Sequence, residues 1–349
     1  MSTQFHRPEL DALRFGAFFL VFLHHALPHA SADYPFAGPA AQALAALARA
    51  GALGVDLFFT LSAYLITELL LREHTSTGTL NIPAFYARRV LRIWPLYYFA
   101  LFVLAPAMVY FRPGDALPAN YVAGFALLSG NWICAFRGYP ASSFTLLWSV
   151  SIEEQFYLVW PWLIRGNVQR IAVCAVAMLV IATATRVVLA ATGTLHPGVW
   201  CNTLARLDSI AGGALLAVWC KQPHPRLWLV ASGLLGLLAI GGFADHAGWI
   251  TVLTYPLAAL ASVSILHGTI GQRWGSRFRL PTYLGKISFG LYVFHVAIIE
   301  LTGPLFALPF TIAAASLSYH FLEAPFLRFK QRYGSKRVSA PALRTLPRI

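Results

Sequence analysis

Charged residues are scarce in this sequence. Only 11% of its 349 residues are Asp, Glu, Lys or Arg, and 58% are hydrophobic, whereas a soluble domain carries roughly 25% charged residues. No polar stretch is long enough to form a soluble domain, although the length alone would permit two. Apolar runs close to the ~20 residues that cross a bilayer recur along the chain. The sequence therefore predicts an all-α, polytopic membrane helix bundle.

Cysteine is also rare, and its spacing gives no indication of a metal site. The four cysteines are Cys134, Cys174, Cys201 and Cys220, with no CxxC pair among them. Cys134 and Cys201 both fall on the predicted outer side, where an oxidising compartment permits a disulfide. Two unpaired, partly buried thiols are the alternative, because cysteine is commonly buried without a bridge.

Acidic residues are half as frequent as basic ones, with 13 Asp and Glu against 26 Lys and Arg and a net charge of +13. The basic residues lie in short clusters between apolar runs, which argues against a nucleic-acid partner and is typical of membrane topology. Ten segments are predicted to span the membrane: 9–29, 51–71, 94–111, 146–164, 171–192, 203–220, 227–243, 248–268, 282–303 and 305–327.

The distribution of basic residues predicts the orientation. If the N-terminus is cytoplasmic, the inner segments hold 19 Lys and Arg and the outer segments hold 3. Both termini are then cytoplasmic. The stretch 120–136 is short and broken by Gly124 and Gly130, which favours a re-entrant or interfacial segment. We expect one membrane domain over 1–330 and a basic cytoplasmic tail over 331–349.

Ionisable residues inside predicted spans are costly, so a functional role is the default interpretation and a structural ion pair is the alternative. Arg14 and His25 lie eleven residues apart in the first span, so they share one face and are separated by ~16 Å along the helix. Glu153 and Glu154 point about 100° apart, and at most one can face a given partner. The other candidates are Asp56, Trp148, Ser149, Arg206, Asp208 and His295.

An arginine cluster lies at the predicted cytoplasmic boundary of the third span. Arg88, Arg89 and Arg92 occupy neighbouring turns, and guanidinium groups bind phosphate with two parallel hydrogen bonds. The cluster therefore predicts a phosphate-binding surface. Positive-inside anchoring with contact to anionic lipid is the alternative.

Seven blocks of the sequence, taken in order, resemble the acyltransferase-3 family of bacterial membrane O-acyltransferases. They are 10–14 with His25, 54–67, 85–95, 148–161, 206–212, 284–295 and 318–325. The chain departs from the family pattern at Ala63, where glycine is common, and at Phe289, where tyrosine is common. Some members carry a fused SGNH hydrolase-like domain, and we expect this chain to be the stand-alone form.

The resemblance implies a multi-pass protein of the bacterial inner membrane. Such a protein moves an acyl group, commonly acetyl, from cytoplasmic acyl-CoA to a hydroxyl of a carbohydrate or small molecule. Exopolysaccharide, O-antigen and lipid-linked glycan are the carbohydrate classes expected. Arg14 and His25 match the essential pair of the family, Arg88, Arg89 and Arg92 match its arginine-rich motif, and Trp148, Ser149 and Glu153 match its Trp-Ser-Glu motif.

These observations predict a site with three parts. His25, Glu153 and Arg14 are the expected catalytic residues, and Arg14 with the arginine cluster is expected to bind acyl-CoA. The substrate-binding residues expected are Asp56, Trp148, Ser149, Glu154, Arg206, Asp208 and His295.

His25 is predicted to act as general base, oriented by Glu153 or Glu154, in direct transfer; an acyl-enzyme intermediate is the alternative. No metal is expected. A secondary transporter and a non-catalytic scaffold remain the rival classes.

Overall fold

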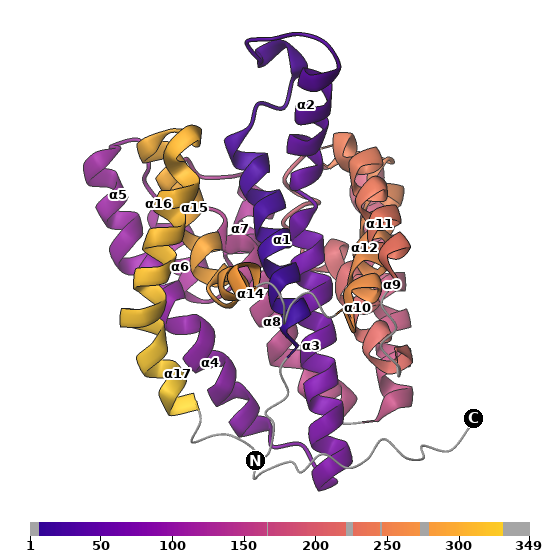
Figure 1. The fold of residues 1–349 in the computed structure, drawn as a ribbon. Helices are drawn as coiled ribbons and strands as arrows, with labels where there is room; N and C mark the ends of the chain where they lie inside the picture. The colour runs from indigo at the N-terminus through magenta and orange to yellow at the C-terminus, as the bar shows by residue number, and fades with distance from the viewer. Residues whose placement is uncertain (1–6, 166, 221–225, 245, 273–278, 331–349) are drawn as a thin grey trace.

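The computed structural model describes residues 7–165, 167–220, 226–244, 246–272 and 279–330, and all the regular elements in these ranges are helices (Figure 1). They are α1 (Pro8–Ala26), η1 (Ser31–Asp33), α2 (Pro39–Gly51), α3 (Gly54–Thr77), α4 (Ile82–Phe99), η2 (Ala100–Leu104), α5 (Ala105–Phe111), α6 (Ala119–Ala126), α7 (Gly130–Arg137), α8 (Leu147–Ile164), α9 (Val168–Ala191), η3 (Leu204–Arg206), α10 (Leu207–Trp219), α11 (Leu227–Ile240), η4 (Gly241–Phe243), α12 (Thr251–Thr269), α14 (Arg279–Lys286), α15 (Ser288–Thr302), α16 (Pro304–Ser318), η5 (Tyr319–Glu323) and α17 (Ala324–Lys330). The predicted basic tail lies outside the described residues.

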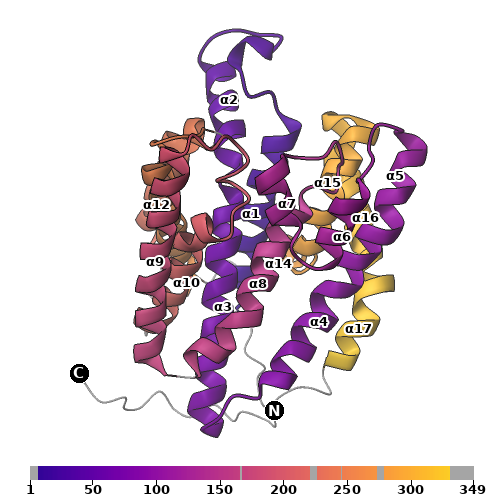
Figure 2. The same ribbon diagram turned by 180° about the vertical axis from the view of Figure 1, so that it is seen from behind.

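The bundle has a central group of helices and two flanking groups. Helices α1, α3 and α8 lie in the middle, α9 to α12 form one flank, and α4, α5 and α15 to α17 form the other (Figures 1 and 2). Helix α1 begins, and α17 ends, at the end of the bundle where α3 gives way to α4. The two ends of the described chain are therefore on one side, as the orientation prediction requires. Helix α2 projects beyond the opposite end.

The helices confirm an all-α, multi-pass membrane protein. In the described ranges, five helices are long and apolar enough to cross a membrane: Pro39–Thr77, Ile82–Phe111, Val168–Ala191, Thr251–Thr269 and Pro304–Phe329. The bent pair α14 and α15 makes a sixth if it counts as one span. The other four predicted spans correspond to α1 and α8, which carry acidic residues, and to α10 and α11, which are shorter than 18 residues. Their crossing stays a prediction.

One predicted span is broken. The segment 282–303 is predicted as one span, but α14 and α15 meet within it at 76°. Helix α14 crosses the start of α1 so closely that a Cβ atom on Gly285 would lie 1.7 Å from the carbonyl oxygen of Asp11. Only glycine permits this approach, which lets α14 cross α1 at close range. The break places Lys286 and Ser288 beside the interior of the bundle.

The stretch 120–136 does not span, as predicted. It forms α6 and α7, each of eight residues and therefore about 12 Å long, well short of the ~30 Å hydrocarbon core. The free carbonyl groups at the end of α6 find side-chain donors on α4. Tyr97 Oη donates to the carbonyl of Phe125 at 2.8 Å, and Tyr98 Oη donates to that of Ala126 at 3.0 Å. These bonds satisfy buried helix-end groups that water cannot reach.

The disulfide considered between Cys134 and Cys201 is not present. Both thiols are free and fully buried, so the alternative of two unpaired thiols describes the structure. The two segments are joined by hydrogen bonds instead, since Asn131 Nδ2 donates to the carbonyl of Cys201 and to Thr203 Oγ1, each at 2.9 Å.

Candidate active site

A cavity opens in the interior between the central helices and the flank that contains α4, α15 and α17. Its apolar wall is formed by Val55, Phe58, Phe59, Ile93, Val150, Phe289 and Leu327. Its polar lining comprises Arg14, Ser62, Arg89, Arg92, Ser149, Glu153, Tyr157, Lys286, Ser288, Tyr292, Tyr319 and Glu323. Arg89 and Arg92 come from the first half of α4 and Leu327 from α17, so this part of the cavity faces the end of the bundle where α1 begins (Figure 1). That end is the predicted cytoplasmic side.

Cations predominate in the lining. Four cationic side chains and two carboxylates, Glu153 and Glu323, face the cavity. Arg14 Nη1 lies 3.3 Å from Asp11 Oδ1. Within the described part of the chain, Arg89, Arg92 and Lys286 make neither a hydrogen bond nor an ion pair, and Arg89 Nε is buried without an acceptor. Lys286 is exposed, and Arg89 and Arg92 are half-buried. Positive charge without a carboxylate partner makes this part of the cavity suited to an anionic ligand.

Arg88 does not belong to this cationic group. Its Nη2 lies 3.1 Å from Glu73 Oε2 on α3, and Glu73 Oε1 also accepts from the backbone N–H of Asn81 at 2.9 Å. Arg88 therefore ties the start of α4 to the end of α3. The prediction that all three arginines bind one ligand is corrected for Arg88, for which the anchoring interpretation fits.

Glu153 and Glu154 face different surroundings, as their angular separation predicted. Glu153 lines the cavity and accepts hydrogen bonds from Ser62 Oγ at 2.9 Å and Tyr157 Oη at 3.0 Å. Glu154 lies outside the lining and accepts from Trp94 Nε1 at 3.0 Å. Only Glu153 is placed to act on a ligand in the cavity, so the substrate-binding prediction for Glu154 is not supported.

The charges on α10 form buried ion pairs rather than a binding surface. Arg206 Nη2 lies 2.8 Å from Asp56 Oδ2, and Arg186 pairs with Asp208. All four side chains are buried, and Ser209 Oγ donates to Asp56 Oδ1 at 2.8 Å. These pairs connect α3, α9 and α10. The structural alternative therefore describes Asp56, Arg206 and Asp208, which were expected to bind substrate.

Two hydroxyl groups lie close together in the wall that α8 and α15 form. Ser149 Oγ and Tyr292 Oη are 2.7 Å apart, and Tyr292 Oη lies 3.2 Å from the carbonyl of Leu146, to which it can donate. Ser149 thus has the predicted position in the site. The neighbouring Trp148 does not line the cavity and packs instead against Trp200, with ring centroids 5.8 Å apart.

His25 lies outside the cavity lining, and its side chain is exposed. His25 Nδ1 is 2.9 Å from the carbonyl oxygen of Val21 and 3.2 Å from His295 Nε2. The ring of Tyr292 is 5.6 Å from that of His295. His25 thus stands between the closed cavity and the exposed surface of the bundle.

The orientation of His25 by Glu153 or Glu154 stays a prediction, because neither carboxylate bonds to the imidazole within the described residues. Both carboxylate oxygens of Glu153 are engaged by Ser62 and Tyr157, and Glu154 bonds to Trp94. His295 takes the place that a carboxylate was expected to fill. This partner cannot be read from helix geometry because α1 and α15 are far apart in the sequence.

Seven polar residues of the lining were not among the predicted site residues: Ser62, Tyr157, Lys286, Ser288, Tyr292, Tyr319 and Glu323. Lys286 carried a signal that could have been used, because it is a lysine inside the predicted span 282–303. Tyr157 lies one turn after Glu153, at a spacing where helix side chains meet. The hydroxyls of Ser62 and Tyr292 carried no comparable signal.

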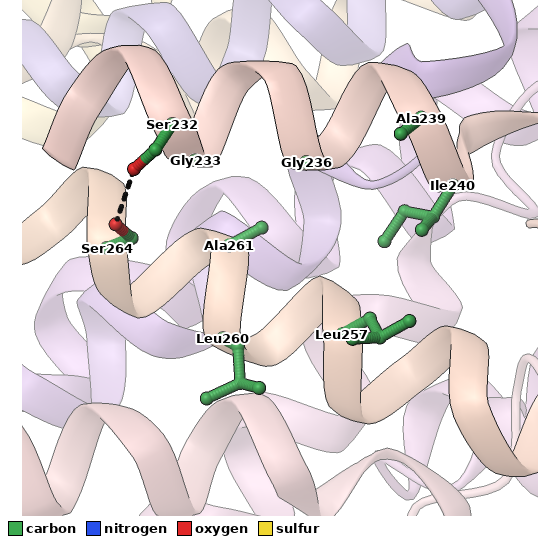
Figure 3. A pocket seen from close by; sticks show the side chains of 9 residues that line it. All are labelled: Ser232, Gly233, Gly236, Ala239, Ile240, Leu257, Leu260, Ala261 and Ser264. Carbon is green, nitrogen blue, oxygen red and sulfur yellow. Dashed lines mark hydrogen bonds between the residues drawn. The ribbon is translucent and has the colours of Figure 1, made fainter. Parts of the chain in front are cut away.

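A second pocket has a different character (Figure 3). It lies between α11 and α12 and is lined by Ser232, Gly233, Gly236, Ala239, Ile240, Leu257, Leu260, Ala261 and Ser264. Its two polar side chains, Ser232 and Ser264, bond to each other at 3.3 Å, and none of these lining residues can ionise. The pocket offers no group for acid–base chemistry. Across the described residues, no cluster of three or more His, Cys, Asp or Glu is placed to hold a metal ion.

The fold and the cavity define a helical membrane protein with an interior cavity whose lining carries four cationic side chains. The chain belongs to the acyltransferase-3 family, whose sequence model, described as an acyltransferase domain, matches residues 7–322. That description favours an acyl-transferring enzyme over the transporter and the scaffold.

The relatives are O-acetyltransferases of bacteria. The chain is 27% identical over 324 residues to peptidoglycan O-acetyltransferase OatA of Listeria monocytogenes, covering 80% of this chain and 51% of that protein. It is 27% identical over 321 residues to O-acetyltransferase OatA of Staphylococcus aureus, covering 79% of this chain and 52% of that protein. The chain thus spans about half the length of these curated relatives. No solved structure matches the chain.

Proposed function

We propose that the protein transfers an acetyl group from cytoplasmic acetyl-CoA to a hydroxyl of a carbohydrate at the bacterial inner membrane. One observation carries the proposal. The cavity carries Arg89, Arg92 and Lys286 toward the predicted cytoplasmic end and the Ser149–Tyr292 hydroxyl pair further in, and His295 connects this wall to the exposed imidazole of His25. The arrangement suits a donor that is anionic at one end and reactive at the other.

The donor enters from the side of α4 and α17. Coenzyme A carries three phosphate groups, and Arg89, Arg92 and Lys286 are cationic lining residues that make no hydrogen bond or ion pair within the described residues. Guanidinium groups bind phosphate through parallel, charge-assisted hydrogen bonds. The slim pantetheine arm then passes Arg14 and Glu153 and brings the thioester toward Ser149 and Tyr292.

His25 acts as the general base in direct transfer. The acceptor oxygen forms a bond to the thioester carbonyl carbon while His25 Nε2 takes the hydroxyl proton. The carbon–sulfur bond then breaks, and the departing thiolate takes the proton from His25. The products are an ester and the free thiol of coenzyme A, and the imidazole is again neutral.

The acceptor reaches His25 from the side away from the donor cavity. This follows from the exposure of His25, which lies outside the lining of the cavity. The relatives named O-acetyltransferase favour acetyl as the group transferred, and the name peptidoglycan O-acetyltransferase favours a glycan acceptor. Exopolysaccharide, O-antigen and lipid-linked glycan remain the acceptor classes proposed.

Arg14 and Glu153 complete the proposed site from within the cavity. Arg14 lies on the face of α1 that carries His25, and it supplies positive charge between the phosphates and the thioester. Glu153 holds the hydroxyls of Ser62 and Tyr157 and so keeps the path of the pantetheine arm in one shape. We assign residues 1–330 to this catalytic domain and 331–349 to a basic cytoplasmic tail.

Purified protein in lipid nanodiscs, supplied with acetyl-CoA radiolabelled in the acetyl group, tests the proposal. We expect label to move to a glycan when each acceptor class is offered in turn, with stoichiometric release of coenzyme A thiol. Absence of both glycan labelling and thiol release with every acceptor, in protein that still binds coenzyme A, would contradict it.

A further inference from the structure

His295 is placed so that it cannot bind a substrate directly. Its side chain is fully buried, and both ring nitrogens are engaged: Nδ1 lies 2.7 Å from the carbonyl oxygen of Tyr292, and Nε2 lies 3.2 Å from His25 Nδ1. The ring of Phe18 meets it edge-on at 5.7 Å. No polar atom of His295 is left for a ligand, so the substrate-binding role expected from the sequence does not fit.

The surrounding acceptors assign the protons of both imidazoles. A carbonyl oxygen only accepts, so the carbonyl of Tyr292 requires a proton on His295 Nδ1. The neutral ring then has a lone pair on Nε2, which faces His25 Nδ1. The carbonyl of Val21, 2.9 Å from the same atom of His25, also requires a proton there. His25 Nδ1–H therefore points at two acceptors.

This assignment leaves His25 Nε2 as the basic atom. With the proton on Nδ1, the neutral ring has its lone pair on Nε2, and Nε2 makes no hydrogen bond within the described part of the chain. If both protons were on Nε2 instead, the lone pair on Nδ1 of each ring would face the oxygen of a backbone carbonyl. One proton arrangement therefore satisfies all three contacts.

We propose that His295 is a positioning residue that holds His25 as a base and accepts a hydrogen bond from its cationic form. This inference rests on the proposed function. When His25 Nε2 takes the acceptor proton, Nδ1–H becomes a charge-assisted donor to His295 Nε2, a stronger bond than the neutral one. His295 thus stabilises the imidazolium without gaining a proton, as an acidic partner does in other general-base pairs.

Three substitutions at one position separate this role from a structural one. His295→Gln can place Oε1 where Nε2 lies and accept from His25. His295→Asn can place its amide near Nδ1 and keep the bond to the Tyr292 carbonyl, but it is too short to reach His25. His295→Leu keeps neither bond. We expect kcat to fall about 100-fold in the Asn and Leu variants, at the low end of what a general base contributes, and less than 10-fold in the Gln variant. KM for both substrates should stay within about twofold.

His267→Leu, on α12, is the matched control and should have wild-type kinetics. Coenzyme A binding, measured for each variant, identifies variants that do not fold. Equal activity of the Gln and Asn variants, or a higher acceptor KM at unchanged kcat, would overturn the proposal.

A measurement that needs no turnover keeps the inference separate from the proposed function. In protein labelled with ¹⁵N-histidine, we expect a protonated Nδ1 and an unprotonated Nε2 for His25, assigned by the signals that vanish in His25→Ala. A protonated Nε2 would overturn the inference even in an active enzyme. If His25 shows a protonated Nδ1 and an unprotonated Nε2 but the protein releases no coenzyme A thiol, the proposed function is contradicted and the inference about His295 is not.

Discussion

Arg88 and Arg89 are adjacent on α4, yet their side chains lie in different surroundings. Arg88 pairs with Glu73 on α3 at 3.1 Å, whereas Arg89 lines the cavity and its Nε is buried without an acceptor. Two neighbouring arginines of one motif thus differ in what they contact. Arg88 joins α4 to α3, and Arg89 faces the cavity.

The two arginines therefore form a matched pair of variants. We expect Arg89→Ala to raise KM for acetyl-CoA about 10- to 100-fold, because a hydrogen bond to a charged group contributes roughly 1.5–3 kcal/mol. Arg88→Ala should lower the thermal stability and leave KM within about threefold. Steady-state kinetics and a melting curve of each variant measure the two effects. Equal changes of KM would show that the separation on α4 has no functional meaning.

Lys286 is expected to act as the third phosphate-binding cation, although the sequence did not place it in the site. Lys286→Met should raise KM for acetyl-CoA several-fold and weaken its dependence on salt, because one electrostatic contact is lost. Lys286→Arg keeps the charge and should restore most of the affinity. Isothermal titration with coenzyme A at two salt concentrations checks this. An unchanged salt dependence in the Met variant would place Lys286 outside the donor site.

Glu153 and Glu154 should respond differently to the same substitution. Glu153→Gln exchanges one acceptor oxygen for a donor, so it cannot accept from both Ser62 and Tyr157, and we expect kcat to fall about 10-fold or more. Glu154→Gln can keep the bond from Trp94 with its remaining oxygen and should stay within about twofold of wild type. Acetyl-transfer rates of the two variants, measured side by side, decide this. Comparable losses would contradict the assignment of Glu153 to the cavity.

The ion pair of Asp56 and Arg206 should behave as a structural element. Asp56→Ala leaves the buried Arg206 without its carboxylate, which costs about 3–5 kcal/mol, and we expect poor folding. The double variant Asp56→Leu, Arg206→Met removes both charges and should regain stability and most of the activity. Melting temperature and acetyl transfer of the single and double variants test this. A stable but inactive double variant would return both residues to substrate binding.

The sequence predicted those features that depend on one helix. Apolar runs located the helices, and the angular step between Glu153 and Glu154 separated their surroundings. The shared face of Arg14 and His25 stays a prediction, since Arg14 lines the cavity and His25 lies outside its lining. The break between α14 and α15 was missed because it depends on Gly285 meeting the backbone of α1.

Contacts between distant helices could not be predicted. The bond between His25 and His295 joins residues 270 positions apart, and an isolated histidine does not reveal its partner. The roles of Arg88 and Arg89 depended on where α3 ends, since Glu73 lies on its last turns. A single sequence fixes which groups a helix carries, but packing decides which of them meet.

The most direct test of the account is the activity of His25→Ala together with its affinity for coenzyme A. His25 lies outside the cavity lining, so we expect the variant to bind coenzyme A with wild-type affinity while acetyl transfer falls by about 10²- to 10⁴-fold, the contribution of a general base. Titration of the purified variant with coenzyme A, followed by transfer of radiolabelled acetyl to a glycan, gives both quantities. Acetyl transfer near the wild-type rate would contradict the account.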